Sequence, residues 1–107
     1  MSRLINTFAV ALSLAAVSAF AQDNAAKDAL YVKSLAATCA NCHGTNGKAV
    51  EGSAVVTLAG MPADYITAQM QAFRSGARPA TIMHQLSKGY SDAQIVQISA
   101  YFAAQKK

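Results

Sequence analysis

Apolar side chains recur at helical spacing in three stretches of the chain. The first stretch runs from about Asn24 to Cys42, and its apolar side chains fall at positions i, i+4, i+8 and i+11: Tyr31, Leu35, Cys39 and Cys42. This spacing puts the four side chains on one face of a helix, so both thiols are expected on its apolar stripe. Asp23 or Asn24 could cap the start of this helix, and Gly44 follows its end.

Two further helices are predicted downstream. The second begins at Pro62, has Asp64 in its first turn and stops at Gly76, in line with the residue preferences of helix ends. The third begins at Ser91, with Gln94 three residues later as a capping box. Their apolar faces consist of Ile66, Met70 and Phe73 in the second helix and of Ile95, Ile98, Tyr101 and Phe102 in the third. Strand patterns are nearly absent, so the predicted fold class is all-α with three main helices.

The amino-terminal segment has the pattern of a secretory signal peptide. Arg3 is its only charge, Phe8–Phe20 is apolar apart from two serines, and Ala19-Phe20-Ala21 offers a small-x-small cleavage site. An uncleaved membrane anchor is the alternative, but the apolar run of 13 residues falls well short of the roughly 20 that span a bilayer. We therefore expect residues 1–21 to be a signal peptide, residues 22–107 to form one exported domain, and the location to be the periplasm.

The chain has two cysteines, and their surroundings indicate the chemistry of the domain. They form Cys39-Ala40-Asn41-Cys42-His43, the attachment pattern of covalently bound haem. Positions i and i+3 of a helical turn share a face, so both sulfurs could reach vinyl groups on one porphyrin edge. His43 could then ligate iron from the proximal side. A bound haem would also give this small domain the extra core that it needs.

Three other interpretations of the cysteines are open. A Cys39–Cys42 disulfide would close almost no loop and would stabilise little. A thioredoxin-type redox pair would need βαβ patterning around it, which the chain lacks. A zinc site needs four ligands, and the nearest further candidate is His84. Only attachment of one haem c explains the histidine directly after Cys42.

An iron atom held by His43 needs a second axial ligand, and a thioether sulfur stabilises ferrous iron. Met83 lies 40 residues after His43, in a long segment that could wrap the distal side, so it is the predicted distal ligand. Met61 lies only 18 residues after His43, and Met70 lies on a buried helical stripe, where core packing is expected. His84 competes with Met83 for the role of distal ligand. Neighbours in an extended loop point in opposite directions, so only one of the two can face the iron. His84 is therefore expected to be an ordinary polar loop residue.

With these residues the chain resembles a bacterial class I cytochrome c, and especially the single-haem halves of di-haem periplasmic cytochromes. The residues that carry the resemblance are Cys39 to His43, Leu58-Ala59-Gly60, Arg74-Ser75-Gly76, Met83, and Ser91-Asp92 leading to Tyr101-Phe102. Two stretches, Thr81-Ile82-Met83 and Lys88-Gly89-Tyr90-Ser91, also resemble the haem subunit of flavocytochrome c sulfide dehydrogenase.

The resemblance implies covalent haem at Cys39 and Cys42, a proximal ligand at His43 and a distal ligand at Met83. It implies electron transfer rather than catalysis, either as a cytochrome subunit fed by a sulfide-oxidising flavoprotein or as a free carrier to a terminal oxidase or reductase. A haem peroxidase would need an open distal site, which Met83 would close. In one departure, residues 53–58 lack the proline whose carbonyl often accepts a hydrogen bond from the proximal imidazole, which leaves the rigidity of that bond open.

Charge adds a weaker expectation about partners. The full chain has nine Lys and Arg and five Asp and Glu, and one of the cations, Arg3, belongs to the predicted signal peptide. Lys48 and Lys88 could steer an acidic redox partner, or they could be ordinary solvated charges. The residues expected around the exposed haem edge are Ala40, Asn41, Ile82, Lys88 and Tyr90. The chain shows no basic stripe with interleaved aromatic residues, so nucleic-acid binding is not expected.

Overall fold

A computed structural model describes residues 22–107, which belong to two compact units, Met1–Tyr31 and Val32–Lys107. The predicted signal peptide lies outside the described residues. In the first unit, residues 22–31 are helical, so Asp23 and Asn24 lie inside a helix and neither caps it as predicted. Both side chains are exposed, and polar residues are tolerated there at small cost.

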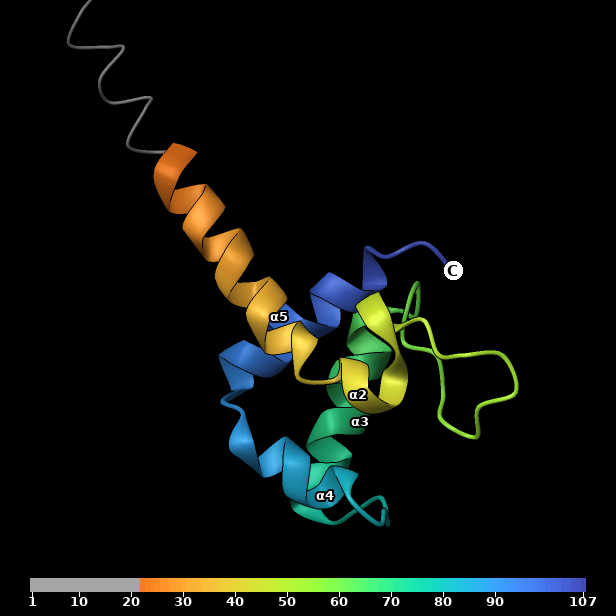
Figure 1. Ribbon diagram of the computed structural model, residues 1–107. Coiled ribbons are helices and arrows are strands. Elements are labelled where there is room, and N and C mark those ends of the chain that lie inside the picture. Colours follow the sequence, from red (N-terminus) through yellow and green to blue (C-terminus); the bar gives the residue numbers. More distant parts are fainter. Residues whose placement is uncertain (1–21) are drawn as a thin grey trace, which may run out of the picture. The chain divides into compact units, whose positions relative to one another are not determined.

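The second unit is built from helices alone within its described residues. Residues 32–37 are helical, and the further elements of this unit are α2 (Ala40–His43), the 3₁₀ turn η1 (Thr45–Gly47), α3 (Ala63–Ser75), α4 (Met83–Leu86), the 3₁₀ turn η2 (Ser87–Gly89) and α5 (Asp92–Ala103) (Figure 1). Residues 22–107 contain no strand, which confirms the all-α prediction. In this part of the chain, no helix has the length and apolar character needed to cross a bilayer.

The first predicted helix is interrupted just before its thiols. A turn occupies Thr38 and Cys39, and α2 then forms the rest of the motif. The backbone N–H of Thr38 donates to the carbonyl of Leu35 at 3.2 Å, and the Thr38 hydroxyl donates to the same carbonyl at 2.7 Å. Such a local bond from side chain to backbone competes with the helical hydrogen-bond ladder. The continuous helix predicted up to Cys42 is therefore wrong at this point.

The second and third predicted helices are present as α3 and α5. Pro62 is the N-cap of α3 rather than its first residue, and Gly76 ends the helix in the left-handed conformation, with φ of 82°. At the start of α5 both bonds of the capping box form. The Ser91 N–H donates to the Gln94 side chain at 2.9 Å, and the Gln94 N–H donates to the Ser91 hydroxyl at 3.2 Å. The local signals for these helix ends were sufficient because both partners of each bond lie within a few residues.

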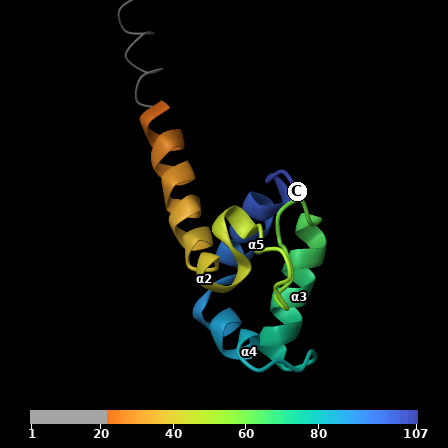
Figure 2. The ribbon, with the colours of Figure 1, turned by 45° about the vertical axis from the view of Figure 1, so that its right-hand side comes forward.

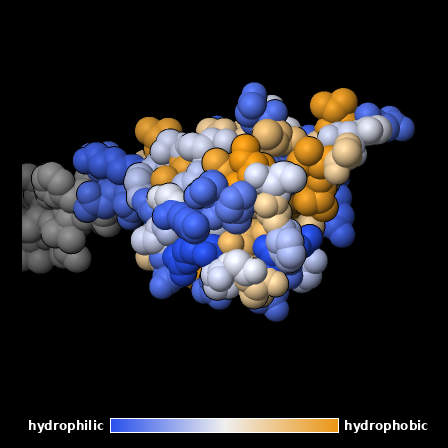
Figure 3. Space-filling view, turned by 90° about the horizontal axis from the view of Figure 1, so that it is seen from below, coloured by the Kyte–Doolittle hydropathy of each residue, from blue (hydrophilic) through white to orange (hydrophobic). Residues whose placement is uncertain are grey.

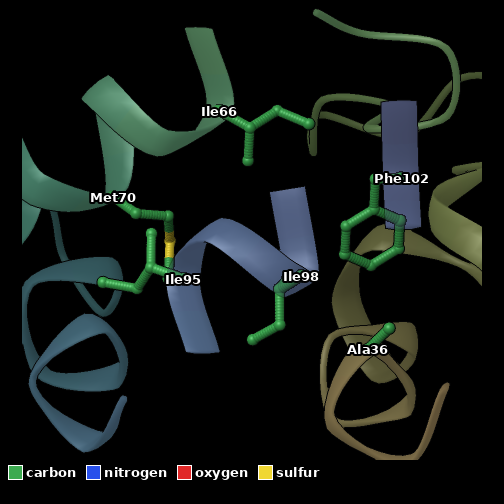
Figure 4. Close-up of a cluster of buried hydrophobic side chains, with 6 residues drawn as sticks. All are labelled: Ala36, Ile66, Met70, Ile95, Ile98 and Phe102. Carbon is green, nitrogen blue, oxygen red and sulfur yellow. The ribbon is translucent and has the colours of Figure 1, made fainter. Parts of the chain in front are cut away.

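The hydrophobic core lies where α3 and α5 pack together (Figure 4). Its buried members are Ala36, Ile66, Met70, Ile95, Ile98 and Phe102. Met70 is thus a core residue, as its position on the apolar stripe of α3 predicts. Figure 2 shows α3 and α5 beside each other, with α4 near the end of α3.

The segment between α3 and α5 is more regular than the extended loop that the sequence suggests. Residues 83–89 form α4 and η2. The carbonyl of Ile82 accepts from the N–H groups of Gln85 at 3.0 Å and Leu86 at 3.1 Å. The Ser87 hydroxyl, fully buried, donates to the carbonyl of His84 at 3.3 Å. Because no glycine or proline interrupts residues 80–88, the backbone can satisfy its own polar groups in helical turns there.

Candidate functional site

His43 ends α2, and its ring is oriented by a backbone carbonyl. Its Nδ1 lies 2.8 Å from the carbonyl oxygen of Val56, and the side chain is half-buried. Because a carbonyl only accepts, the ring donates from Nδ1, and the neutral imidazole then has a free electron pair on Nε2. This tautomer is the one that a metal-ligating histidine needs when its other nitrogen is fixed by a hydrogen bond.

The carbonyl of Val56 is held by a closed loop rather than by a proline. The loop of residues 48–57 leaves and returns at Gly47, whose carbonyl accepts from the N–H groups of Leu58 at 2.7 Å and Ala59 at 3.1 Å. Within the loop, the N–H of Ala49 donates to the hydroxyl of Thr57 at 3.2 Å. Gly47 has φ of 76°, and a Cβ on it would lie 2.6 Å from a ring carbon of Phe102. Glycine at this position therefore lets the loop close directly against the core.

The two thiols of the motif are free and differ in exposure. Cys39 is half-buried and packs against the core cluster, whereas Cys42 is exposed. Burial raises the pKa of the Cys39 thiol, and the oxygen of the Thr38 hydroxyl lies 3.9 Å from its sulfur. The raised pKa keeps this sulfur protonated at neutral pH, as a thiol rather than a charged thiolate.

Met83 is the first residue of α4, is half-buried and packs against the same core cluster as Cys39. Met61 also contacts this cluster, so the fold brings both Met61 and Met83 to the core. The position of His84 differs from its prediction. It lies in α4, it is half-buried, and its buried Nδ1 has no hydrogen-bond partner among residues 22–107. His84 is therefore not an ordinary solvated loop residue.

Tyr90, predicted as a contact for a partner protein, is partly buried and hydrogen-bonded. Its ring packs against the core cluster, and its hydroxyl lies 2.5 Å from the hydroxyl of Thr38. Tyr90 stays a predicted partner contact, and its partial burial has a local cause, because the residue directly precedes the Ser91 cap. An apolar side chain there packs against the fourth residue of the helix, here the fully buried Ile95. An apolar Tyr90 before the Ser91 cap, with Ile95 four residues after that cap, is the sequence signal for this packing.

The other predicted surface residues have mixed exposure. Asn41, Ile82 and Lys88 are exposed, and Ala40 is half-buried. Lys48 is also exposed and lines a shallow polar hollow with Thr45, Asn46, Gln105 and Lys106. This hollow contains none of the candidate haem residues.

The donor set of this site fits a covalently attached iron porphyrin. His43 presents a nitrogen of the required tautomer, Met83 presents a soft sulfur, and the thiols of Cys39 and Cys42 are unpaired. Among residues 22–107, no group of three or more His, Cys, Asp or Glu side chains lies close enough to hold a metal ion by itself.

Comparison with known proteins places these residues in a family. A family model for cytochrome c matches residues 29–106. The chain is 35% identical over 68 residues to the cytochrome subunit of sulfide dehydrogenase from Chlorobaculum tepidum, an alignment that covers 64% of this chain and 60% of that protein. It is 34% identical over 71 residues to the thiosulfate dehydrogenase electron acceptor of Thiomonas intermedia, covering 66% of this chain and 33% of the relative.

A further relative is more similar in length. Cytochrome c-554(548) of Halomonas halodenitrificans is 36% identical over 74 residues, which is 64% of this chain and 86% of the relative. The chain thus spans a third of the thiosulfate dehydrogenase electron acceptor and three fifths of the sulfide dehydrogenase subunit, but most of this smaller cytochrome.

Proposed function

The chain belongs to the cytochrome c family, and on this premise we propose that it transfers single electrons through one covalently bound haem. The observation that carries the proposal is the bond between His43 Nδ1 and the Val56 carbonyl, which leaves Nε2 available for iron. This histidine directly follows Cys42, so one of the two thioethers and the axial ligand would come from one short helix, α2.

Four residues have the proposed roles at the haem. Cys39 and Cys42 form the thioethers, His43 is the proximal ligand and Met83 is the distal ligand. The haem supplies an iron that cycles between the ferric and ferrous states. The protein's part is to supply both axial ligands and to hold the ring in an apolar surrounding, both of which set the reduction potential. His43 and Met83 would together supply both iron ligands, which would leave no open position for a substrate and suits a carrier rather than an enzyme.

The chain is proposed to work outside the cytoplasm. Residues 1–21 have the charged start, apolar centre and small-residue exit of a signal peptide, and residues 22–107 are then the monohaem domain. We place this domain in the periplasm.

The proposed partners are redox proteins of sulfur oxidation. Two relatives have names that refer to sulfide dehydrogenase and thiosulfate dehydrogenase. By analogy, the chain is proposed to be the cytochrome subunit that accepts electrons from a sulfide-oxidising flavoprotein. The exposed Lys88 beside the Met83 segment supports the second candidate, a free carrier that docks transiently on an acidic oxidase or reductase.

Replacing Met83 tests the proposed ligand set. Ferric wild-type protein should show the weak far-red charge-transfer band of sulfur bound to iron. Met83→Ala should abolish this band and lower the reduction potential by on the order of 100 mV, because axial ligands tune haem potentials over a range of roughly 0.8 V. Optical spectroscopy and protein-film voltammetry measure both effects.

Two further methionines provide matched controls. Met61→Ala removes a sulfur that also contacts the core cluster, and Met70→Ala removes one that is buried in it. Both variants should keep the band, and Met70→Ala should lower the thermal midpoint because it leaves a cavity. Loss of the band in Met61→Ala but not in Met83→Ala would move the distal ligand to Met61.

A further inference from the structure

The segment that contains Met83 has a fixed end at Tyr90. From Ile82 onward the backbone turns through α4 and η2, and the N–H of Tyr90 closes the last turn on the carbonyl of Ser87 at 3.5 Å. Ser87 is fully buried within this segment. Since residues 83–90 form consecutive hydrogen-bonded turns, a shift of Tyr90 would be passed along the segment to Met83.

Tyr90 is tied to the turn that precedes the first haem-linking cysteine. The Thr38 hydroxyl has one proton, which it donates to the carbonyl of Leu35 at 2.7 Å. In the 2.5 Å contact between the two hydroxyls, the Tyr90 phenol is therefore the donor and Thr38 the acceptor. The Thr38 oxygen also lies 3.9 Å from the sulfur of Cys39. The bond joins two segments that are 52 residues apart in sequence.

The backbone of Tyr90 is also held by a side chain from α3. Arg74 Nη1 donates to the carbonyl of Tyr90 at 3.3 Å, and Nη2 of the same guanidinium pairs with the carboxylate of Asp92. The side chain of Asp92 is 74% exposed, so this ion pair contributes little by itself. Its consequence here is to fix the guanidinium that holds Tyr90 in place.

We propose that Tyr90 is a positioning residue that, through its bond to Thr38, keeps the Met83 segment in place beside the Cys39 turn. The inference rests on the proposed role of Met83 as distal ligand. A thioether is a neutral ligand that an added nitrogen base can replace, so its occupancy of the iron depends on how firmly its own segment is held. The Tyr90–Thr38 bond supplies this hold between the attachment motif and the distal segment.

The test uses the haem-loaded full chain and the affinity of its ferric form for added imidazole. Imidazole binds only when the distal sulfur has left the iron, so its apparent affinity reports the population of the open state. Tyr90→Phe keeps the ring and removes the hydroxyl. Loss of one hydrogen bond should raise the imidazole affinity about fivefold, together with a weaker far-red band on warming. Thr38→Val should also raise the imidazole affinity. Thr38→Ser keeps a hydroxyl that can accept from Tyr90, so its imidazole affinity should equal that of the wild type.

Tyr101→Phe is the matched control. The Tyr101 hydroxyl donates to the side chain of Asn46 at 2.7 Å, a bond that is also long in sequence and also made by a half-buried tyrosine beside the core. Its loss should cost similar global stability without changing the affinity for imidazole. Adding Tyr90→Phe to Thr38→Val should raise the imidazole affinity no further, since the bond between the two hydroxyls is already lost in Thr38→Val.

Different outcomes separate this inference from the ligand assignment. A wild-type ferric protein without the far-red band would overturn the role of Met83 and, with it, the positioning role of Tyr90. A wild-type protein with the band, but an imidazole affinity of Tyr90→Phe and Thr38→Val no higher than that of Tyr101→Phe, would overturn the role of Tyr90 alone.

Discussion

His43 obtains its orienting partner from the backbone, so the strength of that hydrogen bond depends on the loop that presents the carbonyl. The acceptor belongs to Val56, whose own side chain is 56% exposed and contributes little packing. The neighbouring Thr57 closes the loop by accepting from the N–H of Ala49 at 3.2 Å. At the residue scale, Thr57 is therefore the side chain whose replacement should change the hydrogen bond to the proximal imidazole and, with it, the basicity of the ring.

Thr57→Val should raise the reduction potential. Loosening the loop weakens the hydrogen bond at Nδ1, which makes the imidazole less basic and stabilises the ferric state less. If the hydrogen bond at Nδ1 loses half of a typical contribution, the loss is about 0.5 kcal/mol. For a one-electron couple this energy corresponds to a rise in the reduction potential of roughly 20 mV. Voltammetry of the haem-loaded protein measures the shift.

Ser53→Ala is the control for Thr57→Val. The Ser53 oxygen accepts from the N–H of Val55 at 3.1 Å within the same loop but does not join its two ends. Its removal should leave the potential unchanged. An equal shift in both variants, or a fall in Thr57→Val, would argue against tuning through the loop closure.

At the scale of the elements, α5 links the core to the distal segment. Its inner face contributes Ile95, Ile98 and Phe102 to the core, and its N-cap Ser91 directly follows Tyr90. The start of α5 is fixed by the capping box of Ser91 and Gln94. The stability of this helix end thus bears on both the core and the segment that contains Met83.

Ser91→Ala should lower the free energy of unfolding by about 1 kcal/mol, because the N–H of Gln94 loses its acceptor at the helix start. For a domain of this size the thermal midpoint should fall by roughly 4–8 °C. Thermal unfolding of the haem-loaded protein followed by circular dichroism measures the change.

Ser91→Asp should keep most of the stability that Ser91→Ala loses, since a carboxylate caps equally well and suits the positive end of the helix dipole. If Ser91→Asp and Ser91→Ala lost the same stability, the cap would not be the cause.

At the scale of the whole molecule, the surface near α4 has a mixed character. Figure 3, which views the molecule from the side where α4 lies in Figure 1, shows apolar groups interspersed among hydrophilic ones. Ile82 and Leu86 are 53% and 46% exposed, and Lys88 is exposed beside them. An apolar contact there would suit a persistent subunit, and the lysine would suit a transient, salt-sensitive one.

Ile82→Asp distinguishes the two proposed partnerships. If the chain is a fixed subunit, a flavin-containing protein should co-elute with it from the native host. The substitution should then weaken the complex at least about tenfold, as expected for a central apolar contact, without changing the haem spectrum. Val96→Asp is the matched control, because Val96 is 54% exposed but lies on α5.

A free carrier would give the opposite results. The protein would purify alone, Ile82→Asp would have little effect, and the rate of reduction by an acidic donor would fall steeply as ionic strength rises.

The sequence by itself determined the features whose partners lie close together along the chain. The motif Cys39-Ala40-Asn41-Cys42-His43 predicted the cytochrome c family, which the match over residues 29–106 confirms. Helices α3 and α5 were predicted because an apolar stripe, a left-handed Gly76 and the Ser91 cap are each readable within a few residues. The roles of Cys39, Cys42, His43 and Met83 stay predictions.

Only the tertiary structure decided which distant groups meet. The sequence does not show that the carbonyl of Val56 is the hydrogen-bond acceptor for His43 in a segment without a proline. Nor does it show that the hydroxyls of Tyr90 and Thr38, 52 residues apart, meet. The helical turns after Ile82 and the break at Thr38 also went against the predicted loop and continuous helix. In each case the physical reason is the same. A hydrogen bond between remote segments depends on how the core packs α3 against α5, and local residue preferences contain no information about that packing.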